Sequence, residues 1–356
     1  MNFHVVTDPA QVREVMRRTE DFLPTNALTA VVPLTPAALR ILSRARFALP
    51  PVLASATGEA HLRVRRLVAG FFTPAKVAAV TPRVRELAQK RCAEAAAALH
   101  GGPVDLADVV AKHVPPVVMA ELIGTGLPDL DTLKRWSRDS LELFWGWPDA
   151  DRQPALAGSA AEFYTWLRGE VAAARGTDTL FGVLDRAGLK PAEICSLGYF
   201  LVIAGQETTA QLIATTLYRT LQHPDRWQLL AAGGSARDLV RQVLATESSV
   251  HTWRRAAARA TELDGTMLPA GAEIVLELSG HHAPDAGGTA YSLAFGHGLH
   301  RCLGAKLAEL ETTLVLEETA RALPRVRLHG RDPAWLRLLS FQSPHTVVVR
   351  QEPESP

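Results

Sequence analysis

The stretch that decides the fold is Phe295–Glu311, which reads FGHGLHRCLGAKLAELE. Its first half is rich in glycine, which permits tight turns and lets the backbone approach another group closely. A helical pattern begins after Gly304 and runs over Ala305–Arg321, with apolar residues on one stripe. Cys302 therefore lies in a glycine-rich loop at a helix N-terminus, beside Arg301. The helix dipole and nearby cations favour a thiolate, which a metal ligand or a nucleophile requires.

The spacing Phe-Gly-x-Gly-x-His-x-Cys-x-Gly in this stretch resembles the haem-ligand loop of the cytochromes P450, where a cysteine thiolate is the axial iron ligand. Every motif position is matched, by Phe295, Gly296, His300, Cys302 and Gly304 among others. The resemblance implies a mainly α-helical protein with small β-sheets, the cytochrome P450 fold, and a haem b (iron protoporphyrin IX) ligated by Cys302. The alternative is an ordinary buried cysteine beside a glycine-rich turn. Motifs elsewhere in the chain must distinguish between these two interpretations.

Composition limits the class of protein. The 356 residues could form two average domains or one large one, and 47% of them are hydrophobic. A net charge of +1 suggests neither nucleic acid nor an acidic membrane surface as the main partner. The three cysteines are odd in number and widely spaced, which indicates a reducing compartment. The N-terminus lacks a signal-peptide pattern and the longest apolar stretch, Leu197–Gly205, is too short to cross a bilayer. We expect a cytoplasmic protein with no membrane partner.

A second motif lies near the N-terminus, in a helix predicted over His61–Phe72. His61 and Arg65 are four residues apart and share one face of that helix. Exposed pairs of this kind are usually only solvated. The pair resembles the His-x-x-x-Arg pattern with which P450s bind haem propionates. The presence of the cysteine loop in the same chain favours that role.

A third motif interrupts the apolar helix predicted over Ala192–Gln222. Acidic and hydroxyl side chains in such a run need partners, while Ala204 and Gly205 leave room beside the helix. A threonine hydroxyl can also bond to a carbonyl one turn earlier and bend the helix. The stretch resembles the oxygen-binding groove of the family's central helix, where Glu207 and Thr208 match an acid–alcohol pair that delivers protons. The alternative is a locally kinked core helix.

A fourth match is the segment Val250–Gly271, which in the family contains an arginine that binds a haem propionate. Counting from both ends of the segment selects Arg255 rather than Arg254, and arginine suits bidentate pairing with a carboxylate. The resemblance also implies that His300 anchors a propionate and that Phe295 packs beside the thiolate.

The sequence departs from the family in the helix predicted over Ser235–Thr246. P450s place a buried Glu-x-x-Arg pair there, beneath the cysteine loop, but Gln242 and Ala245 occupy those positions. The connection before the loop is also shorter than usual. A buried charge without its partner is strongly destabilising, so we expect that both charges were lost together. Apolar packing of Leu244 and Leu303 is our hypothesis for what supports the loop instead.

Three further regions are expected to surround a substrate pocket. Pro24–Gly58 is a long apolar loop region with short helices, and we predict that it forms a pocket wall. Asp131–Arg175 corresponds to the mobile helical lid of the family, and we expect most of its aromatic rings to pack the lid onto the core. Those rings are Trp136, Phe144, Trp145, Trp147, Phe163, Tyr164 and Trp166. The Leu338–Ser343 turn would overlie the active site.

The resemblance covers about residues 3–350, so we expect one P450 domain over 1–356, with a short N-terminus that lacks the usual leading helix and strand. It implies a haem-thiolate monooxygenase that oxidises a largely hydrophobic small molecule or natural-product intermediate with O₂. Electrons would come from a ferredoxin and its reductase, docked near Arg66, Arg301 and Lys306. One alternative is a degenerate haem-binding scaffold, which the lost ion pair suggests and the retained Glu207 and Thr208 oppose. Another is a non-hydroxylating enzyme that performs peroxygenation, cyclisation or cross-linking.

Overall fold

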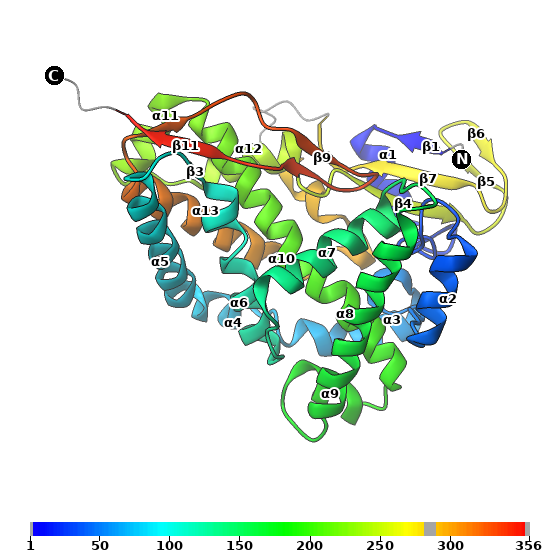
Figure 1. The fold of residues 1–356 in the computed structure, drawn as a ribbon. Coiled ribbons are helices and arrows are strands. Elements are labelled where there is room, and N and C mark those ends of the chain that lie inside the picture. The colour runs from blue at the N-terminus through cyan, green and yellow to red at the C-terminus, as the bar shows by residue number, and fades with distance from the viewer. Residues whose placement is uncertain (1–2, 281–289, 353–356) are drawn as a thin grey trace.

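A computed structural model describes residues 3–280 and 290–352. Its longest element is α10 (Pro191–Leu221), which runs through the middle of the molecule among the other helices (Figure 1). The other helices are α1 (Pro9–Arg17), α2 (Pro36–Arg44), α3 (Gly58–Ala69), α4 (Pro74–Ala79), α5 (Thr81–Leu99), α6 (Val114–Ile123), α7 (Leu130–Trp145), α8 (Gln153–Ala173), α9 (Leu180–Arg186), α11 (Pro224–Ala231), α12 (Arg237–Glu247) and α13 (Ala305–Ala322). Short 3₁₀ helices include η1 (Leu53–Ser55) and η3 (Ala290–Phe295), and Ala107–Ala111 forms a π-helical turn.

The strands form small sheets along one edge of the molecule (Figure 1). A four-stranded sheet has the order β1-β7-β4-β2, a three-stranded sheet the order β3-β11-β8, and β9-β10 and β5-β6 are two-stranded. The strands are β1 (His4–Val6), β2 (Phe22–Leu23), β3 (Val104–Asp105), β4 (Thr252–Ala257), β5 (Thr261–Leu263), β6 (Thr266–Leu268), β7 (Glu273–Glu277), β8 (Val326–Leu328), β9 (Trp335–Arg337), β10 (Gln342–Pro344) and β11 (Val348–Gln351). The predicted fold class, mainly α with small sheets, is confirmed.

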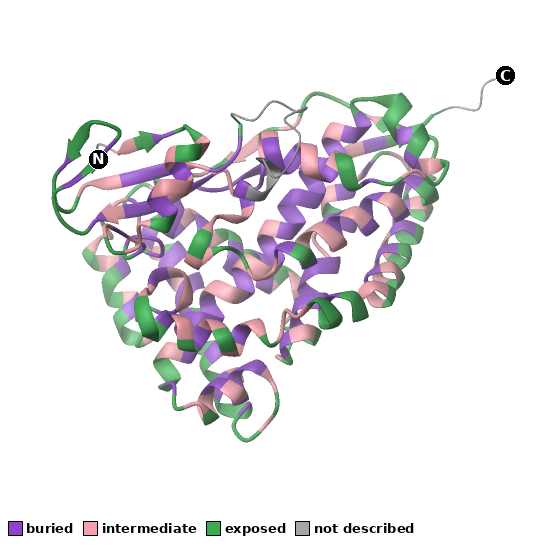
Figure 2. Ribbon diagram, turned by 180° about the vertical axis from the view of Figure 1, so that it is seen from behind, coloured by how far each residue is buried: buried purple, intermediate pink, exposed green. Residues whose placement is uncertain are grey.

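The sequence explains why α10 is long and central. Proline occupies its first position, and the Glu193 carboxylate accepts a hydrogen bond from the Lys190 N–H at 2.7 Å, which caps the N-terminus. Apolar residues dominate the helix on every side, so most of it must be buried, and the central helices in Figure 2 are mostly in the buried colour. It ends one residue before the predicted boundary, ahead of Pro224.

Two large hydrophobic clusters meet along α10. The N-terminal half of the helix, through Ile203, packs in one cluster with α2, α7, α8 and α9. The C-terminal half, from Ile213, packs in the other with α5, α6, α11 and α13. The polar interruption at 204–209 therefore lies at the junction of the two clusters.

The helical lid and the loop region agree with expectation in outline. Pro24–Gly58 contains α2 and η1 and is otherwise irregular, while Asp131–Arg175 is nearly all helix in α7 and α8. Most of the lid rings pack in the core; the Trp136 and Phe163 rings, for example, stack 5.5 Å apart. Trp147 instead is 56% exposed.

The shortened connection before the cysteine loop falls mostly on residues 281–289, outside the described residues. Within the described part, no helix is long and apolar enough to span a membrane.

Gly124 ends α6 in a left-handed conformation and offers a test of the packing. Its φ is 71°, and a Cβ there would lie 2.7 Å from the Thr179 Cγ2 atom. We predict that Gly124→Ala lowers the free energy of unfolding by about 2–4 kcal/mol, since it combines backbone strain with overpacking. Gly176 has a similar φ of 76° with nothing near its Cβ position, so Gly176→Ala should show the strain alone, about 1–2 kcal/mol. Chemical denaturation measures both, and equal losses would contradict the packing argument.

Candidate active site

A cavity of about 240 Å³ lies at the junction of the two hydrophobic clusters, beside the middle of α10. It brings together residues from α3, α10, β4, the cysteine loop and the first turn of α13. The predicted site residues that line it are His61, Arg65, Ala204, Gly205, Thr208, Arg255, Phe295, Gly296, His300, Cys302 and Gly304. Glu207 is not among the lining residues, and neither is Arg254.

The cysteine loop is built as the glycine pattern predicted. Gly296 and Gly298 take left-handed φ values of 71° and 66°, which an L-residue adopts only with strain. The Cys302 N–H donates to the Phe295 carbonyl at 2.8 Å and closes the loop. The Cys302 side chain is open toward the cavity, and α13 begins three residues later.

Opposing effects set the acidity of Cys302. Burial raises the pKa of its thiol, although the N–H groups of Gly304 and Ala305 and the charges of Arg65 and Arg301 lower it. The dipole and the cations thus act in the predicted direction, and desolvation outweighs them. A metal ion bound to the sulfur would supply the missing positive charge, because coordination deprotonates a thiol outright.

Arg255 is buried on the cavity wall, and no carboxylate in the described part of the chain pairs with it. Its Nη1 donates to the Arg254 carbonyl at 2.8 Å, its Nε has no partner, and only 1% of its surface is exposed. Burial lowers the pKa of Arg255 to about 10. A guanidinium in such a place needs an anion, and none of the residues that the structure describes provides one there.

Two histidines and a second arginine complete this side of the cavity. The rings of His61 and His300 lie 4.6 Å apart, held by backbone carbonyls of Leu53 and Ala56. Burial, helped by nearby cations, lowers the pKa of His300 to about 4, and its Nδ1 is buried without a partner. Arg65 Nη2 donates to the Arg301 carbonyl at 2.7 Å.

The groove in α10 has the predicted small residues and hydroxyl. Thr208 Oγ1 donates to the Ala204 carbonyl at 2.6 Å, one turn earlier. A Cβ on Gly205 would lie 2.6 Å from the Sδ atom of Met119, so this thioether from α6 packs directly against the groove. Met119 also lines the cavity; nothing in its sequence surroundings indicated this.

Glu207 faces away from the cavity, toward α7. Its carboxylate accepts a hydrogen bond from Lys134 Nζ at 3.0 Å, and the two residues are only 7% and 6% exposed. Lys134 Nζ also donates to Gln206, whose Nε2 donates to Ser137 at 2.7 Å. Burial lowers the pKa of Lys134, and Glu207 opposes this shift. Sequence reasoning missed Lys134, although a lysine on the apolar face of a predicted helix was a usable signal.

Aromatic side chains form the wall opposite the cysteine loop. Of the seven lid rings only Trp145 lines the cavity. Its ring contacts those of Trp253 and Phe341, and Trp253 in turn contacts Phe200. Phe341 comes from the predicted Leu338–Ser343 turn, and Val52, Leu53 and Ala54 come from the Pro24–Gly58 loop, so both regions reach the pocket as expected. Phe200 and Trp253 were missed, because each sits in an element with a different predicted role.

Comparison with known proteins identifies the family. The chain is 32% identical over 293 residues to the cytochrome P450 monooxygenase PikC of Streptomyces venezuelae, covering 75% of this chain and 68% of that protein. It is 30% identical over 302 residues to erythromycin C-12 hydroxylase of Saccharopolyspora erythraea, covering 78% and 74%. The solved structure of cytochrome P450 CREJ in complex with (4-ethylphenyl) dihydrogen phosphate superposes with a TM-score of 0.91 at 28% identity, over 98% of this chain and 92% of that one. No protein-family model matches the chain.

These similarities, with the fold and the cysteine loop, define a cytochrome P450: the chain belongs to the cytochrome P450 superfamily. Within it, the chain is a monooxygenase of the bacterial type, an oxidoreductase. The family implies a cysteine-ligated haem. The cavity fits such a group, because a sulfur faces it and the orphaned polar atoms of Arg255 and His300 lie on its wall.

The buried Lys134–Glu207 pair gives a pH-dependent prediction. In Glu207→Gln the Lys134 ammonium loses its counter-ion, so the free energy of unfolding should fall by about 3–5 kcal/mol at pH 7. The native variant then favours neutral lysine and binds fewer protons than the unfolded chain, so stability rises with pH toward the ordinary lysine pKa of about 10.4. Urea denaturation between pH 7 and 9 measures this slope.

A matched control is Glu121→Gln, which removes one of the two carboxylate partners of Arg83, the other being Glu86, in an exposed ion-pair cluster. That change should cost no more than about 1 kcal/mol and add no pH dependence. A Glu207→Gln variant that behaved like this control would contradict the buried pair.

Proposed function

We propose that residues 1–356 act as one haem domain that oxidises a largely hydrophobic small molecule with O₂. The observation that carries the proposal is the meeting, on one cavity, of the Cys302 sulfur with buried cationic and imidazole groups that lack carboxylate partners. Iron protoporphyrin IX satisfies both features, since its iron accepts a thiolate and its two propionates accept hydrogen bonds from cations. Cys302 would be the axial ligand. The propionates would be held by His61, Arg65, Arg255 and His300.

When bound, the haem supplies oxygen activation and one-electron chemistry, and the chain supplies orientation and protons. The Thr208 hydroxyl donates its proton to the Ala204 carbonyl, so its oxygen is left to accept a hydrogen bond from water in the groove. Gly205 keeps this part of the helix free of a side chain. Phe295 packs at the loop that carries the thiolate.

Glu207 is the proposed acid that passes protons toward Thr208. Its carboxylate is bound to Lys134 on α7, so the proton can move inward only after that carboxylate turns from α7 toward the cavity. A general acid of this kind contributes typically about 10²–10⁴-fold to a rate. The lid helix and the proton path are thus connected through one buried ion pair.

The cavity wall supports an apolar substrate. Trp145, Phe200, Trp253 and Phe341 face it, and no aspartate or glutamate of the described residues lines it. Relatives carry the names erythromycin C-12 hydroxylase and steroid C26-monooxygenase. We therefore propose a natural-product intermediate or a steroid-like molecule as the substrate class, and a role in secondary metabolism.

Electrons are proposed to come from a ferredoxin and its reductase in the cytoplasm. Arg66, Arg301 and Lys306 are exposed beside the cysteine loop and give this face positive charge, which suits an acidic electron donor. The alternative of a scaffold without turnover has less support, since relatives are named as hydroxylases and monooxygenases.

The haem ligand is tested by Cys302→Ala. The ferrous–CO complex of the wild type should show the red-shifted Soret band of thiolate ligation, and the variant should lose it completely. Cys92 is buried and hydrogen-bonded to Thr319, remote from the cavity lining, so Cys92→Ala should keep the band. Survival of the band in Cys302→Ala would refute the assignment.

The proton-delivery role is tested by Thr208→Ala. We expect reductant consumption to continue while product per reductant falls severalfold, because the hydroxyl that organises the groove is gone. Thr208→Ser keeps the hydroxyl and should retain most of the coupling. Product and NAD(P)H are measured in the same reaction with a substrate that shifts the haem spectrum. Equal coupling in the alanine variant and the wild type would exclude this role.

A further inference from the structure

The cysteine loop must be supported by something other than a buried ion pair, because Gln242 and Ala245 carry no charge. The Gln242 side-chain oxygen accepts a hydrogen bond from Arg226 on α11 at 3.3 Å, so it faces α11. Ala245 is buried and too short to reach a polar partner. Helix α12 must therefore support the loop by other contacts.

An apolar cluster makes the contact between α12 and the loop. It contains Leu212 of α10, Val240, Val243 and Leu244 of α12, and Ala294 and Phe295 of η3. The Phe295 carbonyl accepts the Cys302 N–H, so this cluster acts directly on the backbone that holds the sulfur. The packing of Leu244 agrees with our hypothesis, whereas Leu303 packs against the lid-side core.

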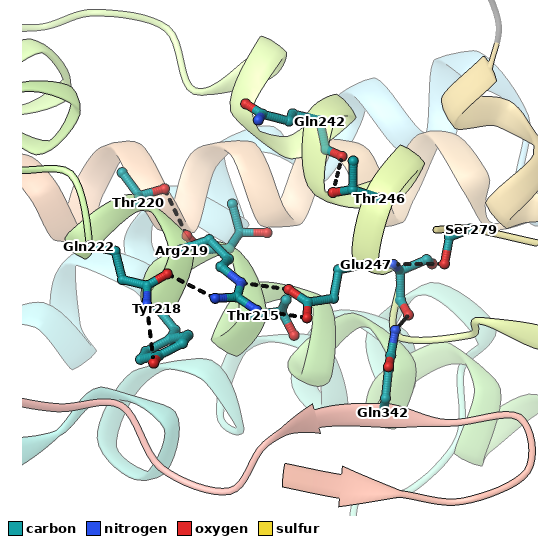
Figure 3. Close-up of polar contacts among 12 residues, drawn as sticks. Thr215, Tyr218, Arg219, Thr220, Gln222, Gln242, Thr246, Glu247, Ser279 and Gln342 are labelled. Atoms are coloured by element: carbon teal, nitrogen blue, oxygen red, sulfur yellow. Dashed lines mark hydrogen bonds and ion pairs between the residues drawn. The ribbon is translucent and has the colours of Figure 1, made fainter. Parts of the chain in front are cut away.

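Besides these apolar contacts, an ion pair between Arg219 and Glu247, here called the charged clamp, joins α12 to α10 at the C-terminal end of α12. Arg219 of α10 donates from Nε and Nη2 to the two oxygens of Glu247 at 2.6 and 2.8 Å, as Figure 3 shows. Arg219 Nη1 donates to Gln222 at 2.9 Å, and its guanidinium lies 5.3 Å from the Trp335 ring centroid. A bidentate guanidinium with a stacked ring has little freedom left.

Ser248, the residue after Glu247, is held by two further hydrogen bonds. The Ser248 N–H donates to Ser279 Oγ at 3.2 Å, and Gln342 Nε2 donates to the Ser248 carbonyl at 3.2 Å (Figure 3). The C-terminal end of α12 is thus bound to α10 and to the strand region, while its apolar face rests on Phe295.

We propose that Arg219 and Glu247 are positioning residues for the haem ligand: they fix α12 on α10 so that the apolar cluster holds the Cys302 loop in place. The proposal rests on the proposed role of Cys302. The two side chains are 40% and 20% exposed, and an ion pair this exposed adds little to global stability. Its effect should therefore appear in the local order of the loop rather than in overall unfolding.

The test uses Arg219→Met and Glu247→Gln in the full chain, with two readouts. Hydrogen exchange of the peptide that contains the Cys302 amide reports loop opening with or without haem. The ferrous–CO spectrum reports the fraction of thiolate-ligated haem. Arg83→Met is the matched control, since Arg83 makes a similar two-oxygen pair with Glu121 between α5 and α6. The charge-swapped Arg219→Glu/Glu247→Arg variant tests rescue.

We expect both single variants to exchange the Cys302 amide about fivefold faster and to lose part of the red-shifted band, while the control does neither and the swapped variant recovers most of both. The proposal would be overturned if the single variants matched the Arg83→Met control in amide exchange and in the fraction of thiolate-ligated haem. It would also be overturned if the swapped variant did not recover what the single variants lose. If Arg219→Met does not fold, Glu247→Gln and the swapped variant decide. A wild type without the red-shifted band would instead refute the ligand assignment, and the exchange result would still decide whether the clamp orders the loop.

Discussion

One helix belongs to both hydrophobic cores, and the position of the site follows from this constraint. The two halves of α10 pack in different clusters, so its middle lies where neither core closes completely. Polar side chains in the middle of a buried helix are costly unless they find partners or a cavity. At 204–208 both solutions occur, since Thr208 faces the cavity and Glu207 faces Lys134.

The molecule treats its buried charges in two contrasting ways. Lys134 and Glu207 neutralise each other across α7 and α10, where the geometry is complete within the chain. Arg255 has no such partner among residues 3–280 and 290–352, so its burial calls for an anion from beyond them. The first arrangement links helices; the second leaves a charge ready for a ligand. Burial is common to Lys134 and Arg255, so only the partner of each charge distinguishes a structural charge from one that can bind a ligand.

The sequence predicted well what local spacing determines. The cysteine loop, the helix that follows it and the α10 groove depend on residues within one or two turns, so their glycines and apolar stripe were sufficient. Arg255 could be chosen over Arg254 by counting from both ends of the segment Val250–Gly271, which matches the family. The family pattern also indicated which helix would carry His61 and Arg65.

What the sequence could not predict depends on pairs far apart in the chain. Lys134 and Glu207 are separated by 73 residues, and the aromatic wall joins four elements that have no common motif. The desolvation of Cys302 could not be predicted because it depends on the whole enclosure, whereas the effects of the dipole and charges on its pKa can be read locally. The unpartnered guanidinium of Arg255 has a further consequence in the cell. A protein that binds its cofactor in the native state alone is stabilised by that binding, and small changes in stability alter how much of a chain escapes proteolysis. With haem as the proposed ligand, the abundance of this enzyme should therefore follow the supply of haem during synthesis, and the chain without haem should be degraded first.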